Sequence, residues 1–229
     1  MRFIPKEGEN RQTFPEHILM LPVWGVGSVD QMVADLICFN AGTFIGRIIT
    51  DVLDPVITPN PYGSDDPPFS STIDIYECDL PIGKTLLLRI IAVCPDQKRQ
   101  IGEFAREITN VAQSLNVREL FLIRSASSIL CLESQIKNWP RAIRITGNLS
   151  DKLDIPLMEQ YGDSRENIRK ATFGDVYTCI KSSSTKPVTM AFVFAGRAHT
   201  IAGALHLAQK LTAKEQLQIP PSWEFINEH

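Results

Sequence analysis

Apolar and polar positions along the opening third of the chain predict a strand, a turn, a helix and a second strand. An apolar run over residues 18–23 precedes a turn rich in glycine, and another apolar run covers residues 44–50. Between them, apolar side chains recur three and four positions apart, which predicts an amphipathic helix from Ser28 to Asn40. Ser28 and Gln31 have the spacing of an N-terminal capping pair, so we expect the helix to begin there.

The rest of the chain predicts further strands and helices. Residues 72–77 and 86–93 are rich in Ile, Leu and Val and flank a short turn segment, which predicts a hairpin. The later predicted elements are a helix over 101–115, a strand over 117–123 with a loop over 124–128, a strand over 188–194 and a helix from His199 to about Glu215. Strands that alternate with helices of this length favour crossover connections and parallel pairing.

These elements predict a single α/β domain over residues 1–229. We expect a mostly parallel central sheet that contains a hairpin, with helices packed on its faces, as in Rossmann-like or phosphorylase-like architectures. Residues 58–71 hold several prolines and predict a surface loop. Residues 130–175 show no clear period and are interpreted as an irregular excursion, and residues 216–229 as a C-terminal tail.

Composition and charge narrow the class of protein. With 229 residues, of which 44% are apolar and 21% charged, the chain matches an ordinary globular domain with a sizeable core. The net charge of −3 and the scattered Lys and Arg residues disfavour nucleic-acid binding. Because no apolar run reaches about 20 residues, we expect no membrane segment. The N-terminus lacks the pattern of a signal peptide, so we expect a location in the cytoplasm with access to the nucleus.

Cysteine usage indicates a reduced protein without a structural metal. The five cysteines are odd in number and include no C-x-x-C pair. Zinc sites need closely spaced ligand pairs, and most of these cysteines stand inside apolar runs, where a thiol behaves as a small apolar group. We therefore predict reduced core residues at Cys38, Cys78, Cys94, Cys131 and Cys179.

The glycine turn is the strongest candidate for a cofactor site. A turn between a strand and a helix offers backbone N–H groups to a phosphate, and Asp51 follows the next strand, near where a ribose-binding acid is expected. Asp30, however, replaces the third glycine of that motif, and its charge suits the dipole of an empty helix but would repel a pyrophosphate. We interpret Gly25-Val26-Gly27 as a tight structural turn capped by Ser28, and predict no cofactor. A nucleotide-dependent enzyme that uses Gly25 to Ser28 is the alternative.

Other motifs give weaker signals. Gly83-Lys84-Thr85 resembles the end of a P-loop, but a strand pattern follows it, so we interpret Lys84 as the exposed corner of the hairpin. No nucleophile elbow occurs, and Ser125, Ser127 and Ser128 stand in no motif that names a base.

Histidines and pairs of acidic residues are the remaining candidates for a catalytic or metal-binding site. The four histidines are His17, His199, His206 and His229. His199 and His206 lie two helical turns apart, about 10 Å, which is too far to chelate one metal; we expect solvent or a partner beside the histidines. The acidic pairs Asp65-Asp66 and Asp151/Asp154 lie in polar surroundings and are predicted to be solvated. These motifs therefore predict no catalytic residue and no metal site, and they leave the question of an enzyme open.

The order of the segments resembles that of the proteasome assembly chaperone 2 family. The similarity covers about the first 125 residues and returns at residues 190–211. The segments that carry it are Met20-Leu21-Pro22-Val23-Trp24-Gly25-Val26-Gly27-Ser28, Asp35-Leu36-Ile37, Asn60-Pro61-Tyr62, Phe121-Leu122-Ile123-Arg124-Ser125 and Ile219-Pro220-Pro221-Ser222-Trp223. The resemblance implies a non-enzymatic chaperone that pairs with proteasome assembly chaperone 1. It also implies that the pair holds α-type subunits while the α ring of the 20S proteasome is built. A homo-oligomeric scaffold, similar to archaeal relatives, is a further alternative.

Two segments depart from that family. Its chaperones can dock a C-terminal tail that ends in a hydrophobic residue, Tyr and any residue, whereas this chain ends in Asn227-Glu228-His229. We therefore assign tail insertion to the partner. Ala195–Thr200 stands where the family resemblance leads us to expect an acidic turn.

Aromatic residues are the candidates for partner contact, because interfaces are centred on aromatic anchors. The candidates are Trp24, Tyr62, Trp139, Trp223 and Phe225, and each of them can equally belong to the core. We select Tyr62, Trp223 and Phe225 as the predicted partner-binding residues. Trp223 and Phe225 follow two prolines and need a surface to pack on, either the body of the chain or a partner.

Overall fold

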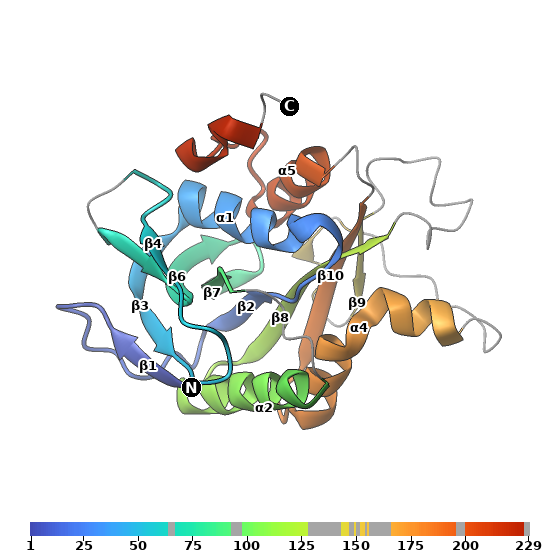
Figure 1. Ribbon diagram of the computed structural model, residues 1–229, viewed down its shortest axis with the longest axis horizontal. Helices are drawn as coiled ribbons and strands as arrows, with labels where there is room; N and C mark the ends of the chain where they lie inside the picture. Colours follow the sequence, from blue (N-terminus) through green and yellow to red (C-terminus); the bar gives the residue numbers. More distant parts are fainter. Residues whose placement is uncertain are drawn as a thin grey trace.

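A mixed sheet lies between two layers of helices (Figure 1). In this computed structural model the described residues are 1–63, 67–92, 98–127, 143–146, 149, 152–153, 155, 166–195 and 200–226. Within them the main sheet has eight strands in the order β1-β3-β6-β7-β2-β8-β10-β9. The strands are β1 Arg2–Pro5, β2 Ile18–Pro22, β3 Thr43–Ile49, β6 Ile73–Leu80, β7 Gly83–Ile90, β8 Glu119–Ser127, β9 Ile143–Thr146 and β10 Val188–Ala195.

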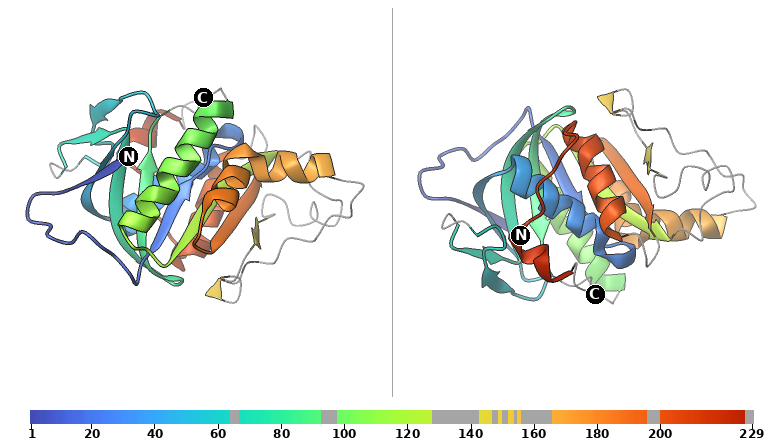
Figure 2. Two further views of the ribbon diagram at one scale, coloured as in Figure 1. Left: turned by 90° about the horizontal axis from the view of Figure 1, so that it is seen from below. Right: turned by 90° about the horizontal axis from the view of Figure 1, so that it is seen from above.

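The helices form one layer on each face of the sheet. Helices α1 (Val29–Ala41) and α5 (Thr200–Thr212) pack side by side on one face, and α2 (Lys98–Ser114) and α4 (Glu166–Ser183) on the other. Figure 2 shows α2 and α4 from below and α1 and α5 from above. The remaining elements are the 3-10 helices η1 (Val26–Ser28) and η5 (Pro221–Ile226) and a separate two-stranded ribbon of β4 (Ile57–Pro59) and β5 (Phe69–Ser71).

Parallel pairing is confined to the centre of the sheet. Strands β7, β2, β8 and β10 are parallel, with Met20 of β2 opposite Phe121 of β8. On the far side of β7, strands β6, β3 and β1 pair antiparallel, and β9 is antiparallel to β10. The predicted α/β class and central sheet are confirmed, and the sheet is mixed because the hairpin reverses the chain and adds antiparallel strands.

The core is divided by the sheet into two clusters. Leu19 and Leu21 of β2 belong to the cluster beneath α2 and α4, and Ile18 and Met20 belong to the cluster beneath α1 and α5. All four side chains are fully buried. Because both faces of β2 are covered, its sequence is continuously apolar instead of alternating.

Most predicted elements are confirmed within a few residues of their ends. They are the first strand, α1, the hairpin of β6 and β7, α2, β10 and α5.

Other predictions need correction. Residues 124–127 belong to β8 and not to a loop, because they pair with β10. Part of the loop predicted over residues 58–71 is the ribbon of β4 and β5, since each strand pairs with the other. Helix α4 and strand β9 begin inside residues 130–175, which were interpreted as irregular, and η5 lies in the predicted tail.

Candidate functional site

The glycine turn lies at the switch point of the sheet. Strands β2 and β8 are parallel neighbours, but the chain leaves β2 through α1 toward β3 on one side and leaves β8 toward β10 on the other. In open α/β sheets, ligands bind in the crevice at the carboxyl ends of such strands. This crevice is therefore the place where a cofactor site would form.

The main chain of β8 occupies the space beside the turn. A Cβ atom added at Gly25 would lie 2.2 Å from the carbonyl oxygen of Ser125 and 2.3 Å from its Oγ. Real Cβ atoms do not approach other atoms this closely, so only glycine allows the turn to pack on β8. Gly25 is needed for contact between two parts of the protein's own main chain.

Asp30 fills the position that an anion would take at the turn. Its buried carboxylate accepts hydrogen bonds from the Gly25 N–H (3.1 Å) and the Ser125 hydroxyl (2.9 Å), both at Oδ1. Burial raises the pKa of Asp30, and the hydrogen bonds from Ser125 and Gly25 oppose that rise. A ligand phosphate at Gly25 would have to displace this carboxylate.

The turn is also fastened from the neighbouring elements. The Arg124 guanidinium donates from Nη1 to the carbonyl oxygens of Val23 (3.0 Å) and Trp24 (2.6 Å). Gly27 has a φ of 66°, and a Cβ there would lie 2.8 Å from Cγ2 of Thr200, at the start of α5. The turn therefore joins β2, β8 and α5.

The predicted cap at Ser28 is wrong. Ser28 adopts the left-handed conformation with φ 54° and ψ 22°, and its side chain makes no capping hydrogen bond. Gly27 before it is also left-handed, so the chain enters α1 through a short 3-10 turn and not through the extended residue that a capping box needs. The carboxylate two residues later, at Asp30, bonds back to the turn in its place.

Asp51 does not reach the turn. It follows the end of β3 and is exposed. Two strands, β6 and β7, separate β3 from β2, so Asp51 lies about 14 Å away along the sheet at the usual strand spacing. Lys84 is exposed at the start of β7, which confirms the hairpin corner.

His17 forms a buried contact with an acidic residue. It is buried, and its Nε2 lies 2.6 Å from Oε1 of Glu77, with its ring edge-on to Phe14. It stands where the chain enters β2 beneath the N-terminal segment, and Glu77 comes from β6. His206 is half-buried on α5.

The described cysteines match the prediction of reduced core thiols most closely at Cys38 and Cys78. Both are buried and free, whereas Cys179 is free and half-buried. Burial raises the pKa of the Cys38 thiol well above its usual value and that of Cys78 to about 12. Such thiols react poorly, because the thiolate is the nucleophile.

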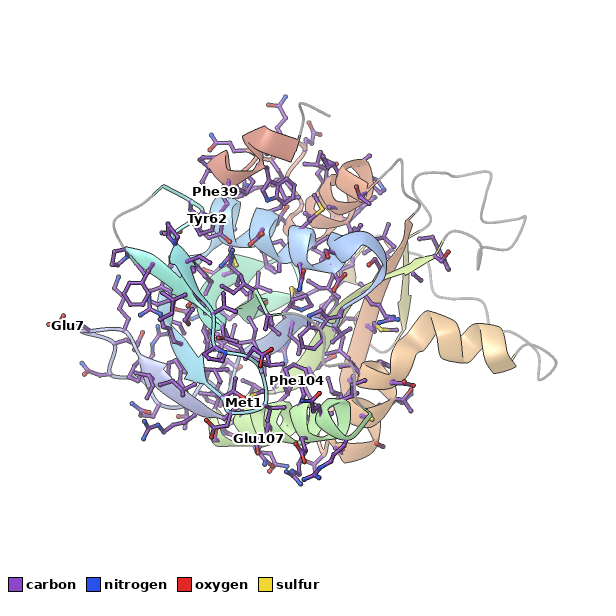
Figure 3. All side chains as sticks on the ribbon, viewed as in Figure 1. Met1, Glu7, Phe39, Tyr62, Phe104 and Glu107 are labelled. Carbon is purple, nitrogen blue, oxygen red and sulfur yellow. The ribbon has the colours of Figure 1, made fainter. Side chains whose placement is uncertain are left out.

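Tyr62 lies in the segment that joins β4 to β5 and packs on α1. Figure 3 shows Tyr62 beside Phe39, and their ring centroids are 5.6 Å apart. Its hydroxyl donates to Oδ1 of Asp35 (3.0 Å), which also accepts from Nε of Arg89 (2.5 Å). Burial raises the pKa of Tyr62. The sequence pattern did not predict this network, although Arg89, a charged residue in the otherwise apolar run of β7, was a signal for it.

Trp223 packs on the body of the chain. Its side chain is 5% exposed and belongs to the core cluster beneath α1 and α5. Phe225 lies in η5, but its side chain is outside the described part of the structure. Contact of Tyr62, Trp223 and Phe225 with a partner stays a prediction. Several other sequence candidates lie outside the described residues: Asp65, Asp66, Cys94, Cys131, Trp139, Asp151, Asp154, His199 and His229.

Two negative findings apply to the described part of the chain. It holds no group of three or more His, Cys, Asp or Glu side chains placed to bind a metal. None of its helices combines the length and the apolar character that crossing a membrane requires.

Comparison with solved structures shows which known proteins have a similar fold. The chain is similar to PbaB of Pyrococcus furiosus, an archaeal proteasome activator, with a TM-score of 0.58 and 9% identity over 94% of this chain and 90% of that chain. It is also similar to PbaA of the same organism, an archaeal homolog of proteasome-assembly chaperone, with a TM-score of 0.55 and 12% identity over 94% and 88%. The chain therefore shares the fold of PbaB and PbaA.

Further matches agree on the fold alone. A protein of unknown function from Thermoplasma acidophilum has a TM-score of 0.53 and 12% identity over 85% of this chain and 75% of that chain. No family model matches the sequence, and a search of curated proteins gives no significant match. The structural likeness confirms the α/β architecture with a central sheet that the order of strands and helices predicted.

Proposed function

We propose that this chain is a non-enzymatic chaperone that pairs with proteasome assembly chaperone 1 and promotes assembly of the α ring of the 20S proteasome. It would act in the cytoplasm, with access to the nucleus. The observation that carries this proposal is a fold shared with PbaA, combined with a glycine turn at the switch point of this chain that is occupied by its own Asp30 and Ser125. A scaffold whose glycine turn is taken up by its own side chains would use its outer surface to bind protein partners.

The same geometry opposes the nucleotide-dependent alternative. A dinucleotide site needs free N–H groups at the turn and room for a pyrophosphate. The Gly25 N–H already donates to Asp30, and Gly25 touches the main chain of Ser125. Asp51, the candidate ribose-binding acid, follows β3, and β6 and β7 separate that strand from β2 and the turn.

Exposed apolar side chains suggest where the partner binds. Ile57 of β4 is 76% exposed and Phe69 of β5 is 41% exposed, while Ile49 of β3 is 56% exposed. Arg47 of β3 donates from Nη2 to the carbonyl oxygen of Phe69 (2.7 Å), so the ribbon lies against the β1–β3 end of the sheet. Exposed apolar side chains that form one patch mark protein interfaces, and we propose that these three form such a patch. Tyr62, in the same ribbon segment, would lie at the rim of the interface.

Co-expression tests the proposal. The tagged chain is produced with and without proteasome assembly chaperone 1 of the same organism and measured by size-exclusion chromatography with light scattering. We expect a 1:1 heterodimer that then retains free α-type subunits. A soluble monomer or homo-oligomer that ignores chaperone 1 would refute the pairing.

A variant pair locates the contact. Ile57→Asp places a charge on the exposed ribbon and should weaken the heterodimer at least tenfold, because desolvating a charge in an apolar interface is costly. Lys181→Asp introduces the same side chain on α4, which packs on the opposite face of the sheet from α1, and should leave the heterodimer unchanged. Equal behaviour of the two variants would remove the ribbon from the interface.

A further inference from the structure

The ribbon of β4 and β5 lies outside the main sheet and is attached to the body of the chain by side chains. Within the described strands, β4 and β5 pair only with each other. Arg47 of β3 holds β5, because its guanidinium donates to the carbonyl oxygen of Phe69 and its Cζ lies 4.3 Å from the centroid of the Phe69 ring. The Val56 N–H, before β4, donates to the hydroxyl of Thr72, after β5 (2.8 Å). The remaining attachment described is in the segment that joins the two strands.

This joining segment carries Tyr62 on a turn that is connected to both strands. Asn60 directly follows β4, and its Oδ1 accepts from the Tyr62 N–H (3.0 Å). The Nδ2 of Asn60 donates to the carbonyl oxygen of Pro67, shortly before β5 (2.8 Å). Asparagine side chains that bond to nearby main chain in this way fix a turn. The position of Tyr62 is therefore coupled to the positions of both strands.

The Tyr62 side chain attaches this turn to α1 and β7. Its hydroxyl donates to Oδ1 of Asp35 in α1 (3.0 Å), and the same oxygen accepts from Nε of Arg89 in β7 (2.5 Å). Cζ of Arg89 lies 5.5 Å from the centroid of the Tyr62 ring, and the ring of Phe39 is 5.6 Å away. Hydrogen bonds to an ionised acceptor are roughly twice as strong as those between neutral groups. The bond to Asp35 therefore gives the Tyr62 ring one preferred position on α1.

The direction of the Tyr62 hydroxyl separates its role from that of the exposed ribbon side chains. Ile57 of β4 and Phe69 of β5 are exposed, whereas the hydroxyl of Tyr62 points into the chain and bonds to Asp35. Tyr62 can therefore affect a partner through the position that it gives to Ile57 and Phe69. A segment that is held in its bound conformation before binding loses less conformational entropy when the partner binds.

We propose that Tyr62 is a positioning residue, whose hydrogen bond to Asp35 holds the ribbon in the conformation that a protein partner binds. This inference rests on the interface proposed above for the ribbon. The bond lies within the chain, so it acts in the free protein before any partner arrives. Without it, only a fraction of the chains presents the ribbon correctly, and the apparent affinity for a partner falls by that fraction.

Hydrogen exchange on the free chain tests the attachment without a partner. Tyr62→Phe removes the hydroxyl and keeps the ring, so peptides that span residues 56–63 and 67–72 should exchange at least about tenfold faster, as expected for the loss of a hydrogen bond to a charged group. A contribution to global stability alone would accelerate the most protected amides of the central sheet, and would leave ribbon amides that exchange through local opening unchanged.

Binding kinetics then test the consequence for the partner. The chain and its variants are captured on a sensor surface, and binding of proteasome assembly chaperone 1 is followed over time. The association rate of Tyr62→Phe should fall about three- to tenfold, because fewer chains hold the ribbon in the binding conformation. The dissociation rate should change less than the association rate, since the bound ribbon is already in place.

Tyr76→Phe is the matched control. The rings of Tyr76 and Tyr62 lie 5.9 Å apart, and within the part of the chain that the structure describes the buried Tyr76 hydroxyl makes no hydrogen bond. Removal of an unpaired buried hydroxyl is close to neutral, so ribbon exchange and binding should stay at the wild-type values.

The outcomes separate this inference from the proposed function. Unchanged ribbon exchange in Tyr62→Phe, or equal acceleration in Tyr76→Phe, would overturn the positioning role. An unchanged association rate with faster dissociation would also overturn it, because that pattern belongs to a side chain that touches the partner directly. A wild-type chain that does not bind chaperone 1 would refute the pairing instead, and the exchange measurement would still decide whether Tyr62 holds the ribbon.

Discussion

The close approach of Gly25 to β8 makes Gly25→Ala the sharpest test of the turn. The new methyl group would meet the carbonyl oxygen, Oγ and N of Ser125 at 2.2, 2.3 and 2.7 Å. Two of these atoms belong to the main chain of a central strand, which cannot rotate away. Inserting a methyl group into a well-packed site costs about 1–3 kcal/mol, and backbone contacts place this variant at or above about 3 kcal/mol.

Thermal unfolding measures this cost. For a chain of this length about 1 kcal/mol lowers Tm by roughly 2–4 °C, so Gly25→Ala should lower it by about 6–12 °C. The matched control is Gly102→Ala in α2, where an added Cβ meets no atom within 4 Å. It should raise stability by about 0.5–1 kcal/mol, because alanine favours the helix over glycine. A Gly25→Ala variant as stable as the wild type would refute the closed turn.

Three further predictions follow from the same structure. Asp30→Ala removes the carboxylate that accepts from the Gly25 N–H and the Ser125 hydroxyl and should cost about 2–3 kcal/mol in urea unfolding. Asp30→Asn keeps an acceptor oxygen and should cost less than Asp30→Ala; equal losses would contradict this reasoning. Hydrogen bonds from Arg11, and secondly from His17, lower the pKa of Glu77 to about 2. Because the pKa of Glu77 is lower in the folded than in the unfolded protein, its ionised form stabilises the fold at neutral pH, and this contribution should be lost as the pH falls from about 5 to about 2. Arg11 is partly exposed, so we expect the contribution to be only about 1 kcal/mol. The pH profile of the stability of Glu77→Gln should lack it. Trp223→Ala should cost about 3 kcal/mol because its ring is buried, and unchanged stability would show that the ring does not belong to the core.

Local periodicity was sufficient to predict elements that bury either both faces or one continuous face. β2 is covered on both faces and reads as an unbroken apolar run, and α1 has one buried face, so both patterns stand out in the sequence. Helix α4 was missed. Its described buried side chains, Val176, Tyr177 and Ile180, form only a short apolar stretch late in the helix.

The site depends on contacts that no local pattern contains. Asp30 and Ser125 are 95 residues apart and meet only because β2 and β8 are neighbours in the sheet. The sequence indicated that Asp30 disfavours a pyrophosphate, through its charge, but not that its carboxylate bonds back to the turn. Likewise, Tyr62 was selected as a candidate partner contact, and the sequence did not indicate that Asp35 and Arg89 engage its hydroxyl and its ring.

The direct test of the central claim is the identity of the proteins bound to this chain in its own cells. The chain is tagged at its natural locus, purified under native conditions and compared by quantitative mass spectrometry with an untagged strain. Our account predicts a second chaperone chain in equal amount together with α-type subunits of the 20S proteasome. Recovery of the chain alone or only with itself, with α-type subunits no higher than in the untagged strain, would contradict it.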